Sequence, residues 1–205
     1  MNNKLLSKEE INYRAIYGKL FSGLLNQFGT NYVSEIEDAI QNSFLKSLRI
    51  WKQNNVPSNK ESWLFIVARN DILNQIKKQK EDPNFSVEQF ENTLSTSNET
   101  DLRLQTIIFI SALENVSNQA KILFVLKNIF GLSIPEIADS TLINPEAIYK
   151  NINRTKKNIQ VEYSGNFIDL NSITAHQQAI SIAEEIFYAV SISVLIPLVK
   201  RRKIL

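Results

Sequence analysis

The sequence predicts an all-α protein: two small helical domains joined by a flexible acidic linker, with a short helical tail. Apolar residues recur at helical spacing along most of the chain, and no segment of useful length alternates as a strand would. The 205 residues are 43% hydrophobic and 21% charged, which is enough to bury one or two small cores. We expect domains at residues 8–80 and 101–160, the linker at 81–100 and a tail of unknown role at 161–205.

The first domain is predicted to contain three helices. The first runs from Lys8 to Phe28 and carries an apolar stripe, namely Ile11, Ala15, Leu20, Leu24 and Phe28. The second runs from about Ser34 to Lys52, with Ser34 as the expected N-cap. Its predicted buried stripe is Ile36, Ile40, Phe44, Leu48 and Trp51, and the stripe beside it is Asp38, Gln41, Leu45, Lys46 and Arg49.

The third predicted helix, Glu61 to Lys80, has two distinct faces. One is an apolar stripe for the core, namely Phe65, Ala68, Ile72 and Ile76. The opposite face changes from aromatic to amide to basic along the helix, through Trp63, Val67, Asn70, Asn74 and Lys77. Two interpretations of Trp63 remain open, since its indole could be exposed for stacking or packed inside the three helices. Trp51 is expected in the core.

The second domain has the stronger local signals. A helix from Asp101 to about Val116 and another from about Ser117 to Phe130 precede Gly131, which suits a left-handed C-cap. Ser133 and Glu136 predict a capping box, and the short helix that they begin ends around Ser140. Asn144 and Pro145 open the last helix. Its apolar side is Ile148, Ile152, Thr155 and Ile159, and its polar side is Glu146, Tyr149, Lys150, Asn153, Arg154 and Lys157.

A short helix, a turn and a longer basic helix with an apolar back are the parts of a helix-turn-helix. Its second helix would dock in the major groove of DNA. The same pattern also fits a helical hairpin with a solvated basic face, and the residues alone leave both interpretations open.

The composition argues against catalysis. The chain has one His and no Cys, and we find neither a Gly-rich phosphate loop nor a Gly-x-Ser-x-Gly elbow. We therefore expect no enzyme activity, no metal and no cofactor. The absence of Cys and of a leader favours the reducing cytoplasm. The apolar stretch from Ile186 to Val199 is shorter than a bilayer-spanning helix requires, so we expect no membrane span.

The formal net charge of +2 conceals basic and acidic blocks. Basic residues gather near Lys77, near Arg154 and near Arg201, whereas acids gather in the linker. The net charge alone is too small to indicate a polyanionic partner, so the placement of the charge matters more.

Three segments carry a resemblance to a known family: EIEDAIQNSFLKSLRIW, VPSNKESWLFIVARNDILNQIKKQK and GLSIPEIADSTLINPEAIYKNINRTKKNIQ. Together they resemble the two domains of bacterial extracytoplasmic-function (ECF) sigma factors of RNA polymerase, over roughly Asn12 to Gln160. The chain looks most like the subgroup with a helical C-terminal extension, here short or truncated. The resemblance implies a region 2-like three-helix unit and a region 4-like helix-turn-helix.

The resemblance also implies roles for particular residues. Those that would bind the clamp helices of the polymerase largest subunit are Asp38, Gln41, Asn42, Phe44, Leu45 and Arg49, where Asn42 replaces the family's usual acid. Those that would bind and melt the minus-ten element are Asn54, Asn55, Ser58, Asn59, Lys60, Ser62, Trp63, Arg69, Asn70, Asn74, Lys77 and Lys78. Those at the minus-thirty-five element are Asn144, Glu146, Tyr149, Lys150, Asn153, Arg154 and Lys157.

The leading hypothesis is therefore a sigma factor that directs core polymerase to promoters and melts them. Its expected partners are the clamp helices and flap of core polymerase, promoter DNA, and an anti-sigma or other regulatory protein. Two alternatives stay open: a helix-turn-helix regulator independent of polymerase, and a degenerate sigma-like helical interaction protein.

Overall fold

A computed structural model describes residues 3–51, 56–80 and 102–162, together with residues 181, 184 and 188. Within these ranges the chain forms seven α-helices, one 3-10 helix and no strand, which confirms the all-α prediction. The linker prediction at 81–100 lies outside the described residues, as does nearly all of the predicted tail. The division into two domains stays a prediction.

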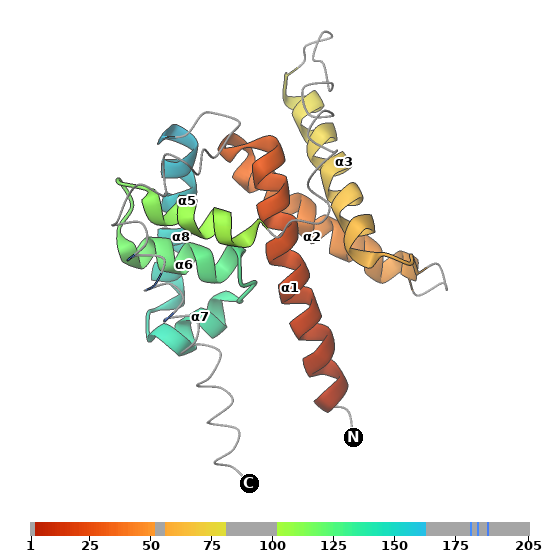
Figure 1. The fold of residues 1–205 in the computed structure, drawn as a ribbon, viewed down its shortest axis with the longest axis horizontal. Coiled ribbons are helices and arrows are strands. Elements are labelled where there is room, and N and C mark those ends of the chain that lie inside the picture. Colours follow the sequence, from red (N-terminus) through yellow and green to blue (C-terminus); the bar gives the residue numbers. More distant parts are fainter. Residues whose placement is uncertain are drawn as a thin grey trace.

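Helix α1 (Asn3–Phe28) is the central element of the fold. Figure 1 shows α2 and α3 on one side of it and helices α5 to α8 on the other. The chain leaves α1 through Gly29, whose φ of 81° is a left-handed value that glycine adopts readily. It then forms η1 (Thr30–Tyr32), α2 (Val33–Ile50) and α3 (Lys60–Lys80). Leu20, Leu24 and Phe28 are buried as predicted, but Ala15 is exposed; the side chain of Ile11 lies outside the described ones.

The structure corrects two predictions for α2. Its N-cap is Tyr32, which makes no side-chain cap bond, so the choice of Ser34 was wrong. Leu48 was predicted in the buried stripe, yet it is 60% exposed, and the neighbouring Ser47 is buried instead. The hydroxyl of Ser47 donates to the backbone carbonyl of Phe44 (2.7 Å), so this small polar side chain is satisfied within its own helix. The buried face of α2 is therefore rotated relative to the predicted one.

Helices α5 (Arg103–Ala112), α6 (Asn118–Asn128), α7 (Ile134–Thr141) and α8 (Pro145–Glu162) follow the predicted order. Gly131 has the predicted left-handed φ of 64°. Both hydrogen bonds of the capping box are present: the Ser133 amide donates to the Glu136 carboxylate (2.8 Å), and the Glu136 amide donates to the Ser133 hydroxyl (3.4 Å). The Asn144 side chain accepts from the Glu146 amide (2.8 Å) at the start of α8. These local predictions are confirmed.

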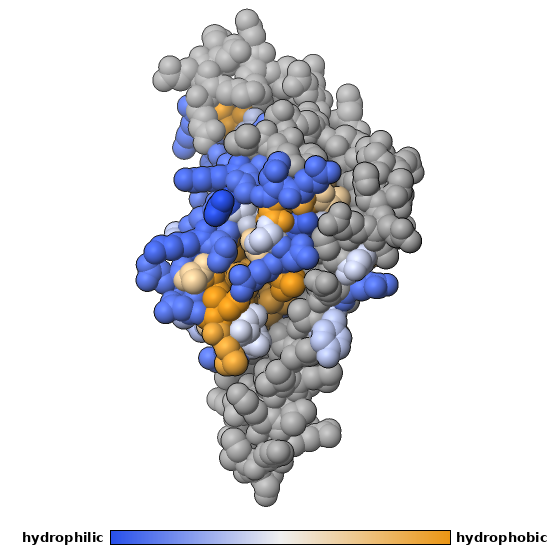
Figure 2. Space-filling view, turned by 90° about the vertical axis from the view of Figure 1, so that its left-hand side faces the viewer, coloured by the Kyte–Doolittle hydropathy of each residue, from blue (hydrophilic) through white to orange (hydrophobic). Residues whose placement is uncertain are grey.

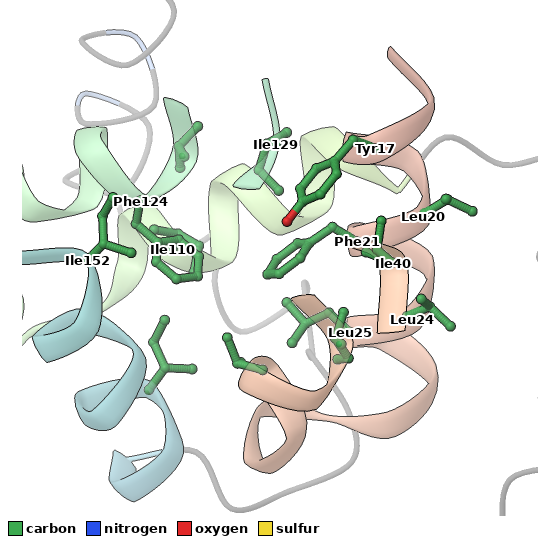
Figure 3. Close-up of a cluster of buried hydrophobic side chains, with 14 of the residues drawn as sticks. Tyr17, Leu20, Phe21, Leu24, Leu25, Ile40, Ile110, Phe124, Ile129 and Ile152 are labelled. Atoms are coloured by element: carbon green, nitrogen blue, oxygen red, sulfur yellow. The ribbon is translucent and has the colours of Figure 1, made fainter. Parts of the chain in front are cut away.

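The buried hydrophobic side chains of the described residues form one cluster, from Tyr17 to Ile159, with members from both predicted domains. Figure 3 shows Phe21 and Tyr17 of α1 pointing toward the group that contains Ile110 and Phe124. The rings of Phe21 and Phe124 meet edge to face, with centroids 6.0 Å apart, and both side chains are fully buried. The two predicted domains therefore share a core.

Candidate polymerase and DNA interfaces

Five of the six residues implied for polymerase binding are exposed on α2, namely Asp38, Gln41, Asn42, Leu45 and Arg49. Phe44 differs, because its ring is half-buried and lies 4.5 Å from the ring of Tyr13 on α1, measured between centroids. The Phe44 ring thus packs between α2 and α1, and only part of it is accessible to a partner protein.

Asn42, the departure from the family pattern, has a partner within the chain. Its side-chain amide donates to the carboxylate of Asp71 on α3 (2.8 Å). An acid at this position would face Asp71 as a like charge, whereas the amide can donate to it. The departure is thus explained by the packing of α2 against α3.

Sequence reasoning missed part of the exposed apolar surface on α2. Leu45 is 56% exposed, Leu48 is 60% exposed and Ile50 is 41% exposed. Large apolar side chains scattered singly over a surface are ordinary, but Leu45 and Leu48 are three residues apart on one helix face and form a candidate contact area. The sequence did not predict the exposure of Leu48, because its spacing also fits the apolar stripe of Ile36, Ile40 and Phe44.

The loop before α3 is described only from Val56 onward, so Asn54 and Asn55 lie outside the described residues. Ser58, Asn59 and Lys60 are exposed. The Asn59 side chain accepts from the backbone amide of Ser62 (3.0 Å) and so caps the start of α3.

Trp63 is neither fully exposed nor part of the sealed core. It is half-buried beside Trp51, with ring centroids 5.5 Å apart, and Lys60 lies 5.5 Å from the centroid of the Trp51 ring. Trp51 was expected in the core, and it is likewise half-buried. Trp51 and Trp63 thus form an indole pair at the start of α3, and part of each ring stays accessible to solvent.

Further along α3, the outer face is polar and basic. Asn70, Asn74, Lys77 and Lys78 are exposed, in agreement with the predicted face. Arg69 is half-buried, and its Nε and Nη2 atoms are buried without a hydrogen-bond partner among the described residues. The predicted apolar stripe is buried at Ala68, Ile72 and Ile76, while Phe65 is half-buried.

Helix α8 separates its two faces as predicted. Ile148, Ile152, Thr155 and Ile159 are buried. The candidate DNA-contacting residues are exposed except for the half-buried Asn153, namely Asn144, Glu146, Tyr149, Lys150, Arg154 and Lys157. Glu146 and Lys150 form an ion pair on this surface (2.7 Å), so Lys150 has a competing carboxylate one turn away.

Figure 2 views the side of the molecule built by α5 to α8, where hydrophilic side chains surround a smaller hydrophobic area. Leu142, at the turn between α7 and α8, is 93% exposed with a φ of 59°. A left-handed backbone at a leucine is uncommon and marks a tight turn. Helices α7 and α8 are in contact on either side of this turn, and the basic side of α8 faces solvent.

No group of His, Cys, Asp or Glu side chains that could hold a metal occurs among the described residues. None of the helices described here is both long enough and apolar enough to cross a membrane.

The comparisons with known proteins concern the first of these interfaces. Residues 13–81 match the family Sigma-70 region 2, and this segment contains η1, α2, α3 and most of α1. The chain is also similar to an uncharacterized protein of Rhizobium meliloti (strain 1021), at 22% identity over 134 residues. That alignment covers 60% of this chain and 31% of the relative, so the chain spans about a third of the relative's length. The search of solved structures returned no significant match.

The match agrees with what the geometry of α2 and α3 implies. Sigma-70 region 2 is a domain of transcription initiation factors that are not enzymes, which supports the expectation of no catalytic activity. Such domains bind core RNA polymerase and promoter DNA. Residues 13–81 are thus similar to the Sigma-70 region 2 domains found in RNA polymerase sigma factors.

Proposed function

We propose that the chain acts as an RNA polymerase sigma factor of the ECF type. It would recruit core polymerase through α2, melt the minus-ten element with α3 and the loop before it, and read the minus-thirty-five element with α8. The observation that carries the proposal is the Sigma-70 region 2 match, which covers the helix with the exposed apolar residues Leu45, Leu48 and Ile50.

The indole pair supports a role in melting. Opening a duplex costs stacking energy. An aromatic side chain that stacks on an unpaired base stabilises the open state by about 1–3 kcal/mol per base. Trp63 lies at the start of α3, and the exposed Lys77 and Lys78 lie about four turns further along the same helix. A DNA strand unpaired at Trp63 would then run along α3, where Lys77 and Lys78 would bind its phosphates.

Support for the second DNA contact comes from the faces of α8. Its apolar side is buried, and its exposed side carries Asn, Arg and Lys, the side chains that most often meet bases and phosphates. An α7–turn–α8 unit in this orientation is what helix-turn-helix docking needs.

The test is a pull-down of core RNA polymerase followed by run-off transcription from a pool of templates with randomised promoter elements. We expect Leu45→Ala/Arg49→Ala to weaken core binding by at least tenfold, because a few residues at the centre of an interface dominate its affinity. Leu104→Ala is the matched control, since Leu104 is 52% exposed on α5 and outside the proposed polymerase and DNA faces.

Unchanged core binding by a correctly folded double variant would contradict the proposal. DNA binding without any core binding would favour the polymerase-independent regulator. Core binding without transcription from any template would favour the degenerate sigma-like interaction protein.

A further inference from the structure

Leu142 is an outlier in two respects. Among the non-glycine residues that the structure describes, it alone has a positive φ, of 59°. Its side chain is also the most exposed of the large hydrophobic side chains in the described part of the chain, at 93%. Glycine is the usual residue where a helix ends in the left-handed conformation. The leucine therefore adds backbone strain while contributing almost no packing, and such strain is concentrated at functional sites.

The turn from Leu142 to Asn144 is held without the Leu142 side chain. The backbone amide of Leu142 donates to the carbonyl of Ala138 (2.8 Å) and so caps α7. Ile143 is half-buried and packs against the core. The Asn144 side chain accepts from the Glu146 amide at the start of α8. Two capping hydrogen bonds and one inward side chain thus fix the turn, and the Leu142 side chain is left in solvent.

The two helices that flank the turn are themselves fixed to the rest of the protein. Arg14 of α1 pairs with Glu136 of α7, and Lys156 of α8 pairs with Glu37 of α2. The second pair is largely withdrawn from water, because the side chains of Lys156 and Glu37 are only 15% and 11% exposed. The turn therefore has little freedom to rearrange, and it presents Leu142 in a preorganised position. Preorganisation lowers the entropy that is lost when a partner is contacted.

Leu142 lies close to the exposed residues at the start of α8. Four peptide units separate it from Glu146, so the two Cα atoms are at most about 15 Å apart. At roughly 3.4 Å per base pair, this distance corresponds to no more than about four base pairs. The first residues of the second helix of a helix-turn-helix contact base edges in the major groove. Leu142 is thus within reach of the groove segment that Asn144, Glu146 and Lys150 would contact.

The chemistry of the major groove determines which group a leucine can recognise there. Base edges present hydrogen-bond donors and acceptors, which a leucine cannot use, and one apolar group, the C5-methyl of thymine. Contact between the leucine and this methyl group removes apolar surface of both from water. A thymine methyl is therefore the group on DNA that matches an exposed leucine.

We propose that Leu142 is a specificity-determining residue, which contacts a thymine methyl group at the edge of the DNA sequence read by α8. This inference rests on the proposed sigma-factor function and extends it, because Leu142 lies outside the polar face of α8 that was expected to bind DNA. It also accounts for the strained turn, since a glycine in this place has no side chain with which to reach the base.

Replacing thymine by uracil tests the contact, because uracil forms the same base pair and lacks only the methyl group. The probe is a closed duplex that the full chain selects from a pool of random sequence, and each of its thymines is replaced in turn. Binding to a closed duplex requires no melting, so it reports on α8. For the wild-type protein we expect one thymine at the edge of the bound sequence whose replacement raises the Kd about fourfold, the effect of one methyl-sized group removed from water.

Variants of Leu142 assign that effect to the leucine. Leu142→Asn introduces a residue that tolerates the left-handed conformation but lacks the apolar side chain. Leu142→Gly removes the side chain and the backbone strain together. For both variants we expect equal Kd values with the thymine duplex and the uracil duplex. Leu104→Asn is the matched control, because Leu104 is an exposed leucine on α5, and it should keep the wild-type difference.

Stability distinguishes a binding role from a structural one. Leu142→Gly should leave the midpoint of thermal unfolding unchanged or raise it, since glycine adopts a positive φ without strain. A lower midpoint would show that the Leu142 side chain stabilises the fold, and would overturn the proposal.

The proposal is also overturned if no uracil replacement weakens binding, or if the Leu142 variants keep the wild-type difference. An unchanged uracil profile together with weaker binding to core polymerase would assign Leu142 to a protein contact instead. Failure of the proposed function looks different. Selection by the wild-type protein would then enrich no sequence, and the wild-type chain would not pull down core polymerase.

Discussion

The helix pairs α2–α3 and α7–α8 carry the candidate interfaces, and they differ in how their structure arises. The α7–α8 pair is specified by contacts within a few residues: a capping box, an Asn cap and a buried stripe of regular spacing. The α2–α3 pair is specified by contacts across the fold, such as Asn42 with Asp71 and Trp51 with Trp63. Local hydrogen bonds fix where a helix begins, whereas distant packing fixes which face it buries.

The largest expected effect tests the long-range side of this comparison. Lys156→Met leaves Glu37 buried without its partner, and breaking a buried pair in this way typically costs about 3–5 kcal/mol. We expect the free energy of unfolding, measured by urea denaturation, to fall by that amount. The double variant Glu37→Leu/Lys156→Met should recover most of the loss, and a double variant no better than the single one would contradict this account.

The same pair gives a pH dependence with a definite sign. Burial raises the pKa of Glu37 above 4.5, and Lys156 only partly opposes the shift. The folded protein therefore binds more protons than the unfolded chain above pH 4.5, so this contribution is complete below pH 4.5 and is lost as pH rises through the folded pKa. Without Lys156 the loss should extend to higher pH. Equal pH profiles for wild type and Lys156→Met between pH 4.5 and neutrality would show that the two groups do not interact.

A smaller change in stability should distinguish Ser133, which caps α7, from Ser34, which was predicted to cap α2 and does not. Ser133→Ala removes the acceptor for the Glu136 amide and should lower the free energy of unfolding by about 1 kcal/mol. Ser34→Ala is the matched control, because Ser34 is exposed inside α2 and is not its N-cap. Thermal denaturation should show a clear loss for the first variant and a change within about 0.5 kcal/mol for the second. Equal losses of unfolding free energy in the two variants would show that the Ser133 cap contributes no more than Ser34.

The interaction energy between Trp51 and Trp63 should be similar to the loss expected for Ser133→Ala, or smaller. A double-mutant cycle of Trp51→Ala and Trp63→Ala should give an interaction energy of about 0.5–1.5 kcal/mol, the range for aromatic pairs. Permanganate reactivity of promoter thymines then separates stability from melting. If Trp63 stacks on an unpaired base, Trp63→Ala should reduce open-complex formation on duplex templates, and a premelted bubble should rescue it. Failure of the rescue in a stably folded variant would leave the pair with a structural role alone.

The smallest effect concerns the exposed ion pair of α8. Glu146→Gln removes the partner of Lys150, and such surface pairs contribute only about 0.3–0.5 kcal/mol. We expect almost unchanged stability but tighter DNA binding, because a negative charge is removed and Lys150 is released to meet phosphate. Binding measured at several salt concentrations checks this. Weaker binding would instead assign Glu146 a direct contact with a base.

The all-α class, the order of the helices, the left-handed Gly131 and the capping box of α7 followed from the sequence, because each depends on residues within a few positions of one another. The residues of α8, apart from the half-buried Asn153, were likewise sorted correctly into buried and exposed sets by their spacing. What the sequence could not decide was the face of α2, where Leu48 and Ser47 are equally compatible with a helical stripe until α3 packs against them.

Only the tertiary structure decided the half-buried position of Trp63, the pairing of Asn42 with Asp71 and the inward turn of Lys156 toward Glu37. Each depends on a partner from another helix, 12 to 119 residues away in the chain. Local propensity carries no information about such partners, because the energy that selects them comes from the apolar surface and buried charge that the assembled helices remove from water.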